Sequence, residues 1–312
     1  MQFVFPDYYK NFTCIAGSCR HNCCIGWEID IDEDTLRYYD SVSGPFGQRL
    51  QKNISRDDTP HFILGAEERC PFLNEKNLCD IILTLGEECI CGICSDHPRF
   101  RNELPGRVET GLGLCCEEAA RLILSQSAPV TLEYSGEQEY EDEIIALRDR
   151  VFTLLQDRTI PVTRRVEEML RLCSANSPSL SIGEWASLLL ELERLDPSWT
   201  DLLLSLKEGW KTADYAGFSR HMESRQSEYE QLLVYLIYRH MANAPDFISL
   251  AARASFAALI YHLLYTLGAV IWTNTGLFSF EDQVELARLF SSEIEYSDEN
   301  LYLILDSLAA GE

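Results

Sequence analysis

The sequence predicts a mainly α-helical protein in which an irregular, cysteine-rich N-terminal module with a few short strands precedes an all-α domain. Three observations predict this. Eleven of the twelve cysteines lie before residue 117. After about residue 140 the apolar residues recur at helical spacing, with capping residues between the runs. A chain of 312 residues is also long enough for two domains, which we place at 1–126 and 127–312.

The N-terminal module is expected to hold only short elements. Residues 1–24 have no regular pattern, whereas Trp27–Ile31 alternates apolar and polar side chains, as a strand does. Asp32 is a good N-cap for a helix through Tyr39. We interpret Glu109–Leu114 as a turn that leads into Cys115 and Cys116. Further elements are expected at Phe46–Ile54 (helix), His61–Leu64 (strand), Leu78–Leu85 (helix ending at Gly86) and Glu117–Ser125 (helix).

The second domain is expected to follow a polar linker at Gln126–Gln138. Ser181 and Glu184 form a capping box, and Pro197 separates two of the helices. Ser198 is the predicted cap of the helix that follows Pro197. The other helices are predicted at Glu139–Asp157, Pro161–Cys173, Ser181–Leu195, Asp214–Ala242, Asp246–Thr273, Phe280–Phe290 and Asp298–Ala309.

One apolar run, Ala254–Trp272, is about as long as a membrane-spanning helix. It contains His262 and Gly268, and its flanks are not basic as those of a membrane anchor tend to be. We therefore predict a buried helix at the centre of the all-α domain, with His262 as a core residue and no membrane partner.

The net charge of −24, of which residues 127–312 carry −16, restricts the partners. Such a surface repels nucleic acid and favours a basic protein, although the charge also serves solubility alone. The first residues, MQFVFPDYYKNF, do not resemble a secretory signal, so we expect a cytoplasmic protein with reduced cysteines. In a secreted protein, twelve cysteines would instead fit six disulfides.

The cysteines are the clearest chemical signal. Cys14, Cys19, Cys23 and Cys24 follow one another within eleven residues, and Cys91–Cys94 has a common metal-knuckle spacing. Thiolates are soft ligands that bind zinc or an iron–sulfur cluster, and the spacing alone leaves both open. A metal that only stabilises the module would produce the same pattern.

The remaining candidate residues have simpler alternatives. Asp96, His97 and Arg99 could tune the metal or orient a substrate carboxylate, or could belong to a solvated loop. The acidic turn Glu293–Asp298 is interpreted as a helix cap with a solvated face, and Cys173 as a buried apolar residue. The sequence shows no Ser-His-Asp, Walker or H-E-x-x-H pattern, so the catalytic residues stay unknown.

Several segments together resemble the flagellin lysine-N-methylase family, within the CxxCxxCC-type putative zinc- or iron-chelating proteins. The similar segments are YYKNFTCIAGSCRHNCCIGWEIDID, RCPFLNEKNLCDI, LGEECICGICSDHPRF and LGLCCEEAARLIL, and more weakly LLVYLIYRHM and SSEIEYSDENL. The resemblance implies a cytoplasmic protein-lysine N-methyltransferase that uses S-adenosylmethionine, acts on surface lysines of flagellin and holds a [4Fe-4S] cluster.

The resemblance also implies which cysteines matter. The family's pattern matches nine of them, and from these we predict the metal ligands, with zinc as the alternative to the cluster. Arg99 is the predicted cofactor-binding residue. Two other functions remain open, a non-enzymatic metal-binding or trafficking protein and an acidic helical scaffold for a basic partner. The matching cysteines are Cys14 and the eight predicted ligands Cys19, Cys23, Cys24, Cys70, Cys79, Cys91, Cys94 and Cys116.

Overall fold

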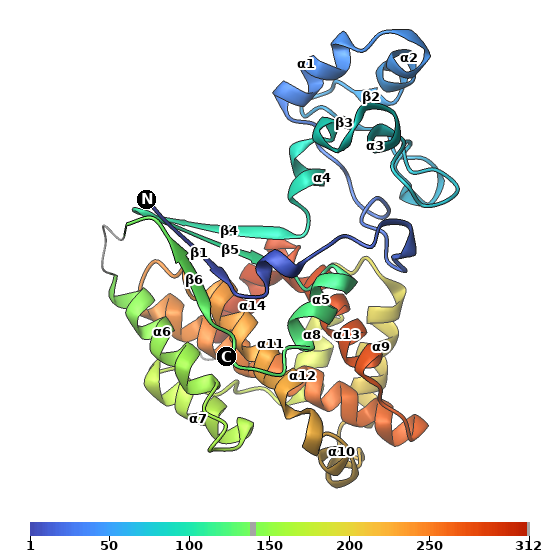
Figure 1. The fold of residues 1–312 in the computed structure, drawn as a ribbon. Helices are drawn as coiled ribbons and strands as arrows, with labels where there is room; N and C mark the ends of the chain where they lie inside the picture. Colours follow the sequence, from blue (N-terminus) through green and yellow to red (C-terminus); the bar gives the residue numbers. More distant parts are fainter. Residues whose placement is uncertain (138–141, 311–312) are drawn as a thin grey trace. The chain divides into compact units, whose positions relative to one another are not determined.

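The computed structural model describes residues 1–137 and 142–310 and is mainly α-helical (Figure 1), which confirms the predicted fold class. The chain divides into two compact units. Unit 1 contains residues 1–12 and 100–312, and unit 2 contains residues 13–99. The boundary predicted at residues 126/127 falls inside unit 1, because the N-terminal strand and the segment after residue 99 pack with the helices.

Unit 2 has a small core of its own around Phe62 and Phe72, whose rings lie 5.1 Å apart. Asp32 accepts a hydrogen bond from the Thr35 amide at 2.9 Å, which confirms the predicted N-cap. Ile29 is buried as the alternation requires, but Trp27–Ile31 makes only an isolated bridge and no strand. The unit contains α1 (Glu33–Ser41), α2 (Gly44–Lys52), α3 (Asp80–Leu85), α4 (Gly92–Asp96), β2 (Ile54–Ser55) and β3 (His61–Phe62).

Unit 1 contains a four-stranded sheet that the sequence analysis missed. Its order is β4 (Arg99–Leu104, beginning at the unit boundary), β5 (Arg107–Leu112), β1 (Gln2–Pro6) and β6 (Leu132–Ser135). β1 is parallel to β5 and antiparallel to β6. Strands therefore occupy parts of the segments that were expected to be irregular (1–24), a turn (109–114) and a linker (126–138). Each is short and pairs with a distant segment, so it has too little local pattern to predict.

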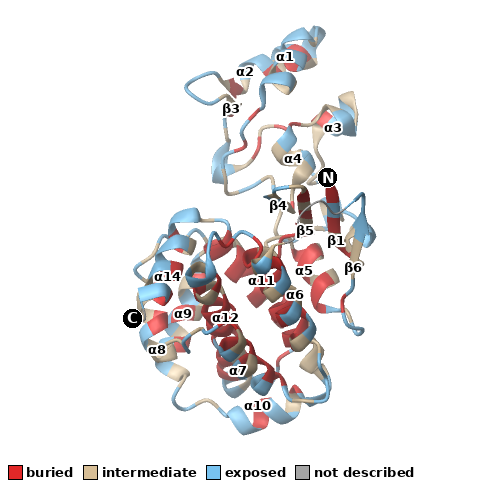
Figure 2. Ribbon diagram, turned by 90° about the vertical axis from the view of Figure 1, so that its left-hand side faces the viewer, coloured by how far each residue is buried: buried red, intermediate tan, exposed pale blue. Residues whose placement is uncertain are grey.

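The helices of unit 1 pack around α12 (Phe247–Thr275), whose residues are mostly buried (Figure 2). α12 is long and apolar enough to cross a membrane, but 83% of its most apolar window is buried inside the fold, as in a core helix. The other helices are α5 (Glu117–Leu124), α6 (Glu143–Leu155), α7 (Val162–Leu172), α8 (Ile182–Leu189), α9 (Pro197–Gly209), α10 (Tyr215–His221), α11 (Gln226–His240), α13 (Phe280–Phe290) and α14 (Asp298–Ala310).

Most predicted helices are confirmed, with four local corrections. The expected helix Asp214–Ala242 is broken at Met222–Arg225 into α10 and α11. Asp196, and not Ser198, is the N-cap of α9, because its side chain accepts the Ser198 amide. α8 ends at Leu189, six residues before the predicted end. His262 is exposed on α12, so it is not the core residue that the sequence predicted. The predicted start at Glu139 lies outside the described residues.

Candidate functional site

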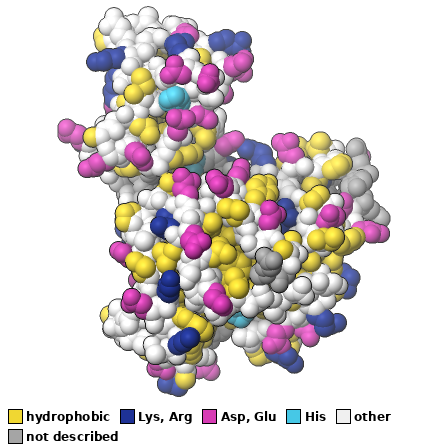
Figure 3. Space-filling model, turned by 180° about the vertical axis from the view of Figure 1, so that it is seen from behind, with side chains coloured by type: hydrophobic (Ala, Val, Ile, Leu, Met, Phe, Trp, Pro, Cys, Tyr) yellow, Lys and Arg dark blue, Asp and Glu magenta, His cyan; other side chains and the backbone are white. Residues whose placement is uncertain are grey.

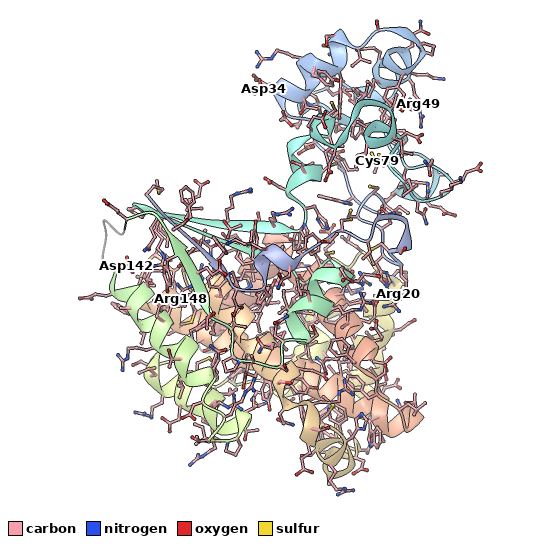
Figure 4. All side chains as sticks on the ribbon, in the orientation of Figure 1. Arg20, Asp34, Arg49, Cys79, Asp142 and Arg148 are labelled. Carbon is pink, nitrogen blue, oxygen red and sulfur yellow. The ribbon has the colours of Figure 1, made fainter. Side chains whose placement is uncertain are left out.

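Six of the predicted cysteine ligands converge in unit 2, and backbone hydrogen bonds bring their loops together. The Cys70 amide donates to the Cys24 carbonyl at 2.9 Å, which joins the first cysteine group to the second. The Asp32 carboxylate accepts the Gly92 amide at 2.8 Å and so holds the start of α4, directly after Cys91, against α1. Cys79 is the residue before α3 (Figure 4). Three separate loops therefore carry cysteines into the same core.

Six cysteines lie close enough together in unit 2 for each to affect the pKa of at least one other, and we call them the cysteine cluster: Cys23, Cys24, Cys70, Cys79, Cys91 and Cys94. Cys91 and Cys94 have their sulfur atoms 3.3 Å apart. The pKa of the Cys94 thiol is raised by its hydrogen bond to Cys91, then by burial and by the nearby Cys24 and Cys70. Burial also raises the pKa of Cys70, to about 11. Cys70 and Cys91 are buried, Cys24, Cys79 and Cys94 are partly buried, and Cys23 is exposed. Several thiols gathered in one small core are typical of a metal-binding module.

Two further predicted ligands are Cys19 and Cys116. The Cys19 thiol donates to the His21 carbonyl at 3.2 Å, and Cys116 is the N-cap of α5 in unit 1. All twelve cysteines are free thiols. Within residues 1–137 and 142–310, no three His, Cys, Asp or Glu side chains have the arrangement of a metal site. The ligand set therefore stays a prediction.

Arg99 and His97 follow the last cysteine of the cluster. Arg99 donates to the Ser95 carbonyl at 3.2 Å, and its charge lies close enough to affect His97. Burial lowers the pKa of His97 to about 4, with a smaller contribution from Arg99. The His97 ring lies 5.9 Å from that of Trp27. The role of Arg99 at a cofactor stays a prediction.

Unit 1 contains a second polar centre, which the sequence analysis did not identify. The segment Ser291–Glu295 forms one turn of π-helix between α13 and α14, a rare geometry that is frequent at functional sites. This turn buries the Glu295 carboxylate completely. One carboxylate oxygen lies 2.6 Å from His240 Nε2, and the other accepts a hydrogen bond from the Tyr235 hydroxyl at 2.7 Å.

Arg239 extends this centre toward the surface. Its guanidinium donates to the Tyr235 hydroxyl at 2.8 Å and lies over the rings of Phe100 and Tyr296. The Tyr296 side chain in turn shares a hydrogen bond with the Cys115 thiol. We call these residues the Glu295 cluster: Cys115, Tyr235, Arg239, His240, Glu295 and Tyr296.

The prediction that Glu293–Asp298 is a solvated acidic turn is therefore wrong for its two glutamates. Glu293 is buried and accepts the amides of Leu195 and Asp196 at 3.0 and 2.7 Å. The sequence did contain a signal, since Arg239 and His240 directly follow the apolar run of α11. Charged residues inside an apolar helix require buried partners, but only the fold shows that Glu295 is that partner.

The part of the chain that resembles known proteins contains most residues of the Glu295 cluster. Residues 180–312 match the family model described as the FliB lysine N-methylase C-terminal domain. The resemblance to the flagellin lysine-N-methylase family is therefore confirmed over this region. The matched region contains Arg239, His240 and Glu295, and it contains no cysteine.

Curated relatives from Salmonella align over 134 residues, 41% of this chain. The identity is 27% to the lysine-N-methylases of Salmonella choleraesuis (strain SC-B67) and Salmonella typhimurium (strain LT2), and the alignment covers 33% of each. It is 29% to the flagellar biosynthetic protein FliU of Salmonella muenchen, of which the alignment covers 79%. The chain thus aligns with only a third of the length of the two lysine-N-methylases. No solved structure matches the chain.

Proposed function

We propose that this protein is a protein-lysine N-methyltransferase that transfers a methyl group from S-adenosylmethionine to surface lysines of flagellin in the cytoplasm. The observation that carries the proposal is the match of residues 180–312 to the lysine N-methylase C-terminal domain. The relative named as a flagellar biosynthetic protein supports a flagellar substrate.

The reaction makes defined demands on the protein. A bond forms between the lysine nitrogen and the methyl carbon while the carbon–sulfur bond of the donor breaks, and one proton leaves the amine. Free lysine has a pKa of about 10.4, so the amine must lose its proton before it attacks. The amine and the methyl group must also be held in line. The described residues supply buried polar groups in unit 1, but we assign none of them as the base.

We further propose that the cysteine cluster holds a [4Fe-4S] centre, with zinc as the alternative. The six free thiols fit either group, since both need four thiolate ligands. Cys24, Cys70, Cys91 and Cys94 are the residues we expect to bind it, because their thiols interact with one another. A bound centre of this kind would hold together the loops that carry its ligands and, for iron, would supply redox capacity.

A basic protein substrate agrees with the charge of the chain. The net charge is −24, and acidic side chains are spread over the face seen in Figure 3 with basic ones among them. Long-range attraction would therefore raise the rate at which a lysine-bearing surface meets the protein.

The decisive experiment is a methylation assay with anaerobically purified protein, lysine-rich flagellin and S-adenosylmethionine, read by mass spectrometry of flagellin peptides. We expect mono- or multiply methylated lysines only when both the donor and the protein are present. A matched flagellin in which surface lysines are replaced by arginine is the control for substrate. Unmodified flagellin after incubation with metal-loaded protein would contradict the proposal.

The alternative of a non-enzymatic metal-binding protein is favoured by one observation. The cysteine cluster lies entirely outside residues 180–312. That alternative predicts metal binding without any binding of the donor or of its product, which calorimetry distinguishes from the methyltransferase.

A further inference from the structure

The Glu295 cluster has an inner part whose hydrogen-bonding capacity is used within the protein. Both Glu295 oxygens are occupied, by His240 and Tyr235. The Tyr235 hydroxyl also accepts the Leu114 amide at 3.3 Å and Arg239 at 2.8 Å. These groups are buried and hydrogen-bonded to one another. The inner part therefore positions its neighbours and has no accessible group for a ligand.

Arg239 is different, because its donors are only partly used. A guanidinium has five N–H groups. Among the described residues, only the contact with Tyr235 is shorter than 3.0 Å, while the contacts with the Glu295 backbone and carboxylate are 3.4 and 3.6 Å. The Arg239 side chain is 12% exposed, and its neighbour Tyr296 is 43% exposed. The cluster therefore reaches the surface at these two residues.

The aromatic rings hold the guanidinium in place. Its central carbon lies 5.1 Å from the centre of the Phe100 ring and 4.9 Å from that of Tyr296. Such cation–π contacts fix the plane of the group and reduce the entropy it loses when it binds a ligand. A planar guanidinium that is already fixed is well suited to a carboxylate, which it can bind through two parallel hydrogen bonds.

The neighbouring groups also favour an anion. Burial raises the pKa of the Tyr296 hydroxyl above its usual range, so this group is neutral near pH 7 and adds no negative charge beside Arg239. The only acidic side chain of the cluster, Glu295, is already occupied. A lysine ammonium would meet the like charge of Arg239 here, whereas a carboxylate would accept hydrogen bonds from the Arg239 N–H groups that no described residue binds closely.

We propose that Arg239, with Tyr296 and Cys115 at its side, binds the carboxylate of an amino-acid group in a small ligand. This inference rests on the proposed function, under which that group is the methionyl part of the methyl donor. Tyr235 and Glu295 are then positioning residues, since they hold Arg239 and do not touch the ligand.

The test compares two ligands by calorimetry. S-Adenosylhomocysteine carries the amino-acid group, and 5′-methylthioadenosine is a close analogue that lacks it. We expect Arg239→Gln to weaken binding of S-adenosylhomocysteine about 10- to 100-fold, as for loss of a charged hydrogen-bonded pair, and to leave binding of methylthioadenosine unchanged. Arg239→Lys should restore part of the affinity, because it keeps the charge without the planar fork.

A matched control is Arg288→Gln, since Arg288 is an equally buried, ion-paired arginine of the same unit. It should bind both ligands as the unchanged protein does. If Arg239→Gln does not fold, as judged by circular dichroism, Tyr296→Leu provides the test, because this ring is half exposed. It should weaken S-adenosylhomocysteine selectively.

Equal weakening of both ligands, or no weakening by either variant, would overturn the proposal. If flagellin is methylated while Arg239→Gln keeps its affinity for S-adenosylhomocysteine, the proposed function stands and the carboxylate site is wrong. If the unchanged protein binds neither ligand, both this site and the choice of donor are wrong.

Discussion

His240 Nε2 lies 2.6 Å from Glu295 Oε1, although the two residues are 55 positions apart in the sequence. The pair joins the end of α11 to the π-turn between α13 and α14. The two short segments that carry the weaker resemblance to lysine N-methylases, LLVYLIYRHM and SSEIEYSDENL, are therefore neighbours in the fold. Their contact is a buried hydrogen bond between a carboxylate and an imidazole, and the Arg239 guanidinium lies 3.6 Å from the same carboxylate as its counter-charge. The energetic role of this contact is measurable.

Removal of the Glu295 charge should destabilise the protein strongly. Glu295→Leu leaves Arg239 without its buried counter-charge, so we expect the free energy of unfolding to fall by about 3–5 kcal/mol. Glu295→Gln retains the shape and part of the hydrogen bonding, so it should lower the free energy of unfolding by less than Glu295→Leu does. Urea denaturation followed by circular dichroism measures both. A Glu295→Leu protein as stable as the original would show that the pair contributes nothing.

The same pair predicts an acid-sensitive stability. Burial alone would raise the pKa of Glu295, but Arg239 and His240 outweigh it and lower the pKa to about 2. In the unfolded chain the value is about 4.3, so the ionised carboxylate contributes about 3 kcal/mol above that pH. This contribution is lost as the pH falls from about 4.3 toward 2. Glu295→Gln should lose less stability over this range.

His240 acts in the same direction at higher pH. Burial lowers its pKa below the value of about 6.5 expected in the unfolded chain. Below about pH 6.5 the imidazole is protonated in the unfolded chain but stays neutral in the fold. Lower pH therefore favours the unfolded state. Thermal unfolding between pH 8 and pH 5 should show a fall in stability that His240→Gln reduces. An unchanged slope in this variant would contradict the neutral, buried imidazole.

Metal content should depend on the cysteine cluster and not on cysteines in general. Cys70→Ser removes a buried thiol of the cluster, so we expect anaerobically purified protein to lose most of its iron and acid-labile sulfide. Cys173→Ser is the matched control, since Cys173 is equally buried but lies at the end of α7. A colourless protein with stoichiometric zinc would replace the iron–sulfur proposal by a zinc site.

The sheet of unit 1 should tolerate no side chain at Gly111. A Cβ atom at this position would lie 2.3 Å from Cζ of the Phe100 ring. Gly111→Ala should therefore lower the free energy of unfolding by about 1–3 kcal/mol through overpacking. The double variant with Phe100→Leu should recover part of the loss, because a smaller, flexible side chain can move aside. Equal stability of both variants would contradict this clash.

Local signals were sufficient for much of the secondary structure. The caps at Asp32 and Ser181 and the core position of α12 could be predicted, because a helix is specified by neighbours three to four residues apart. The convergence of the cysteines was also foreseeable, since a dense set of thiols in a reduced chain has few other uses. The sheet and the Glu295 cluster were not, because their partners are far apart in sequence.

By itself the sequence determined a mainly α-helical protein with cysteines gathered into one module, since periodicity, capping and composition act over short distances. Only the tertiary structure decided that β1 pairs with β5, that Glu293 and Glu295 are buried, and that Arg239 keeps unused donors near the surface. The physical reason is that burial of a charge depends on which distant group compensates it, and that partner is chosen by packing.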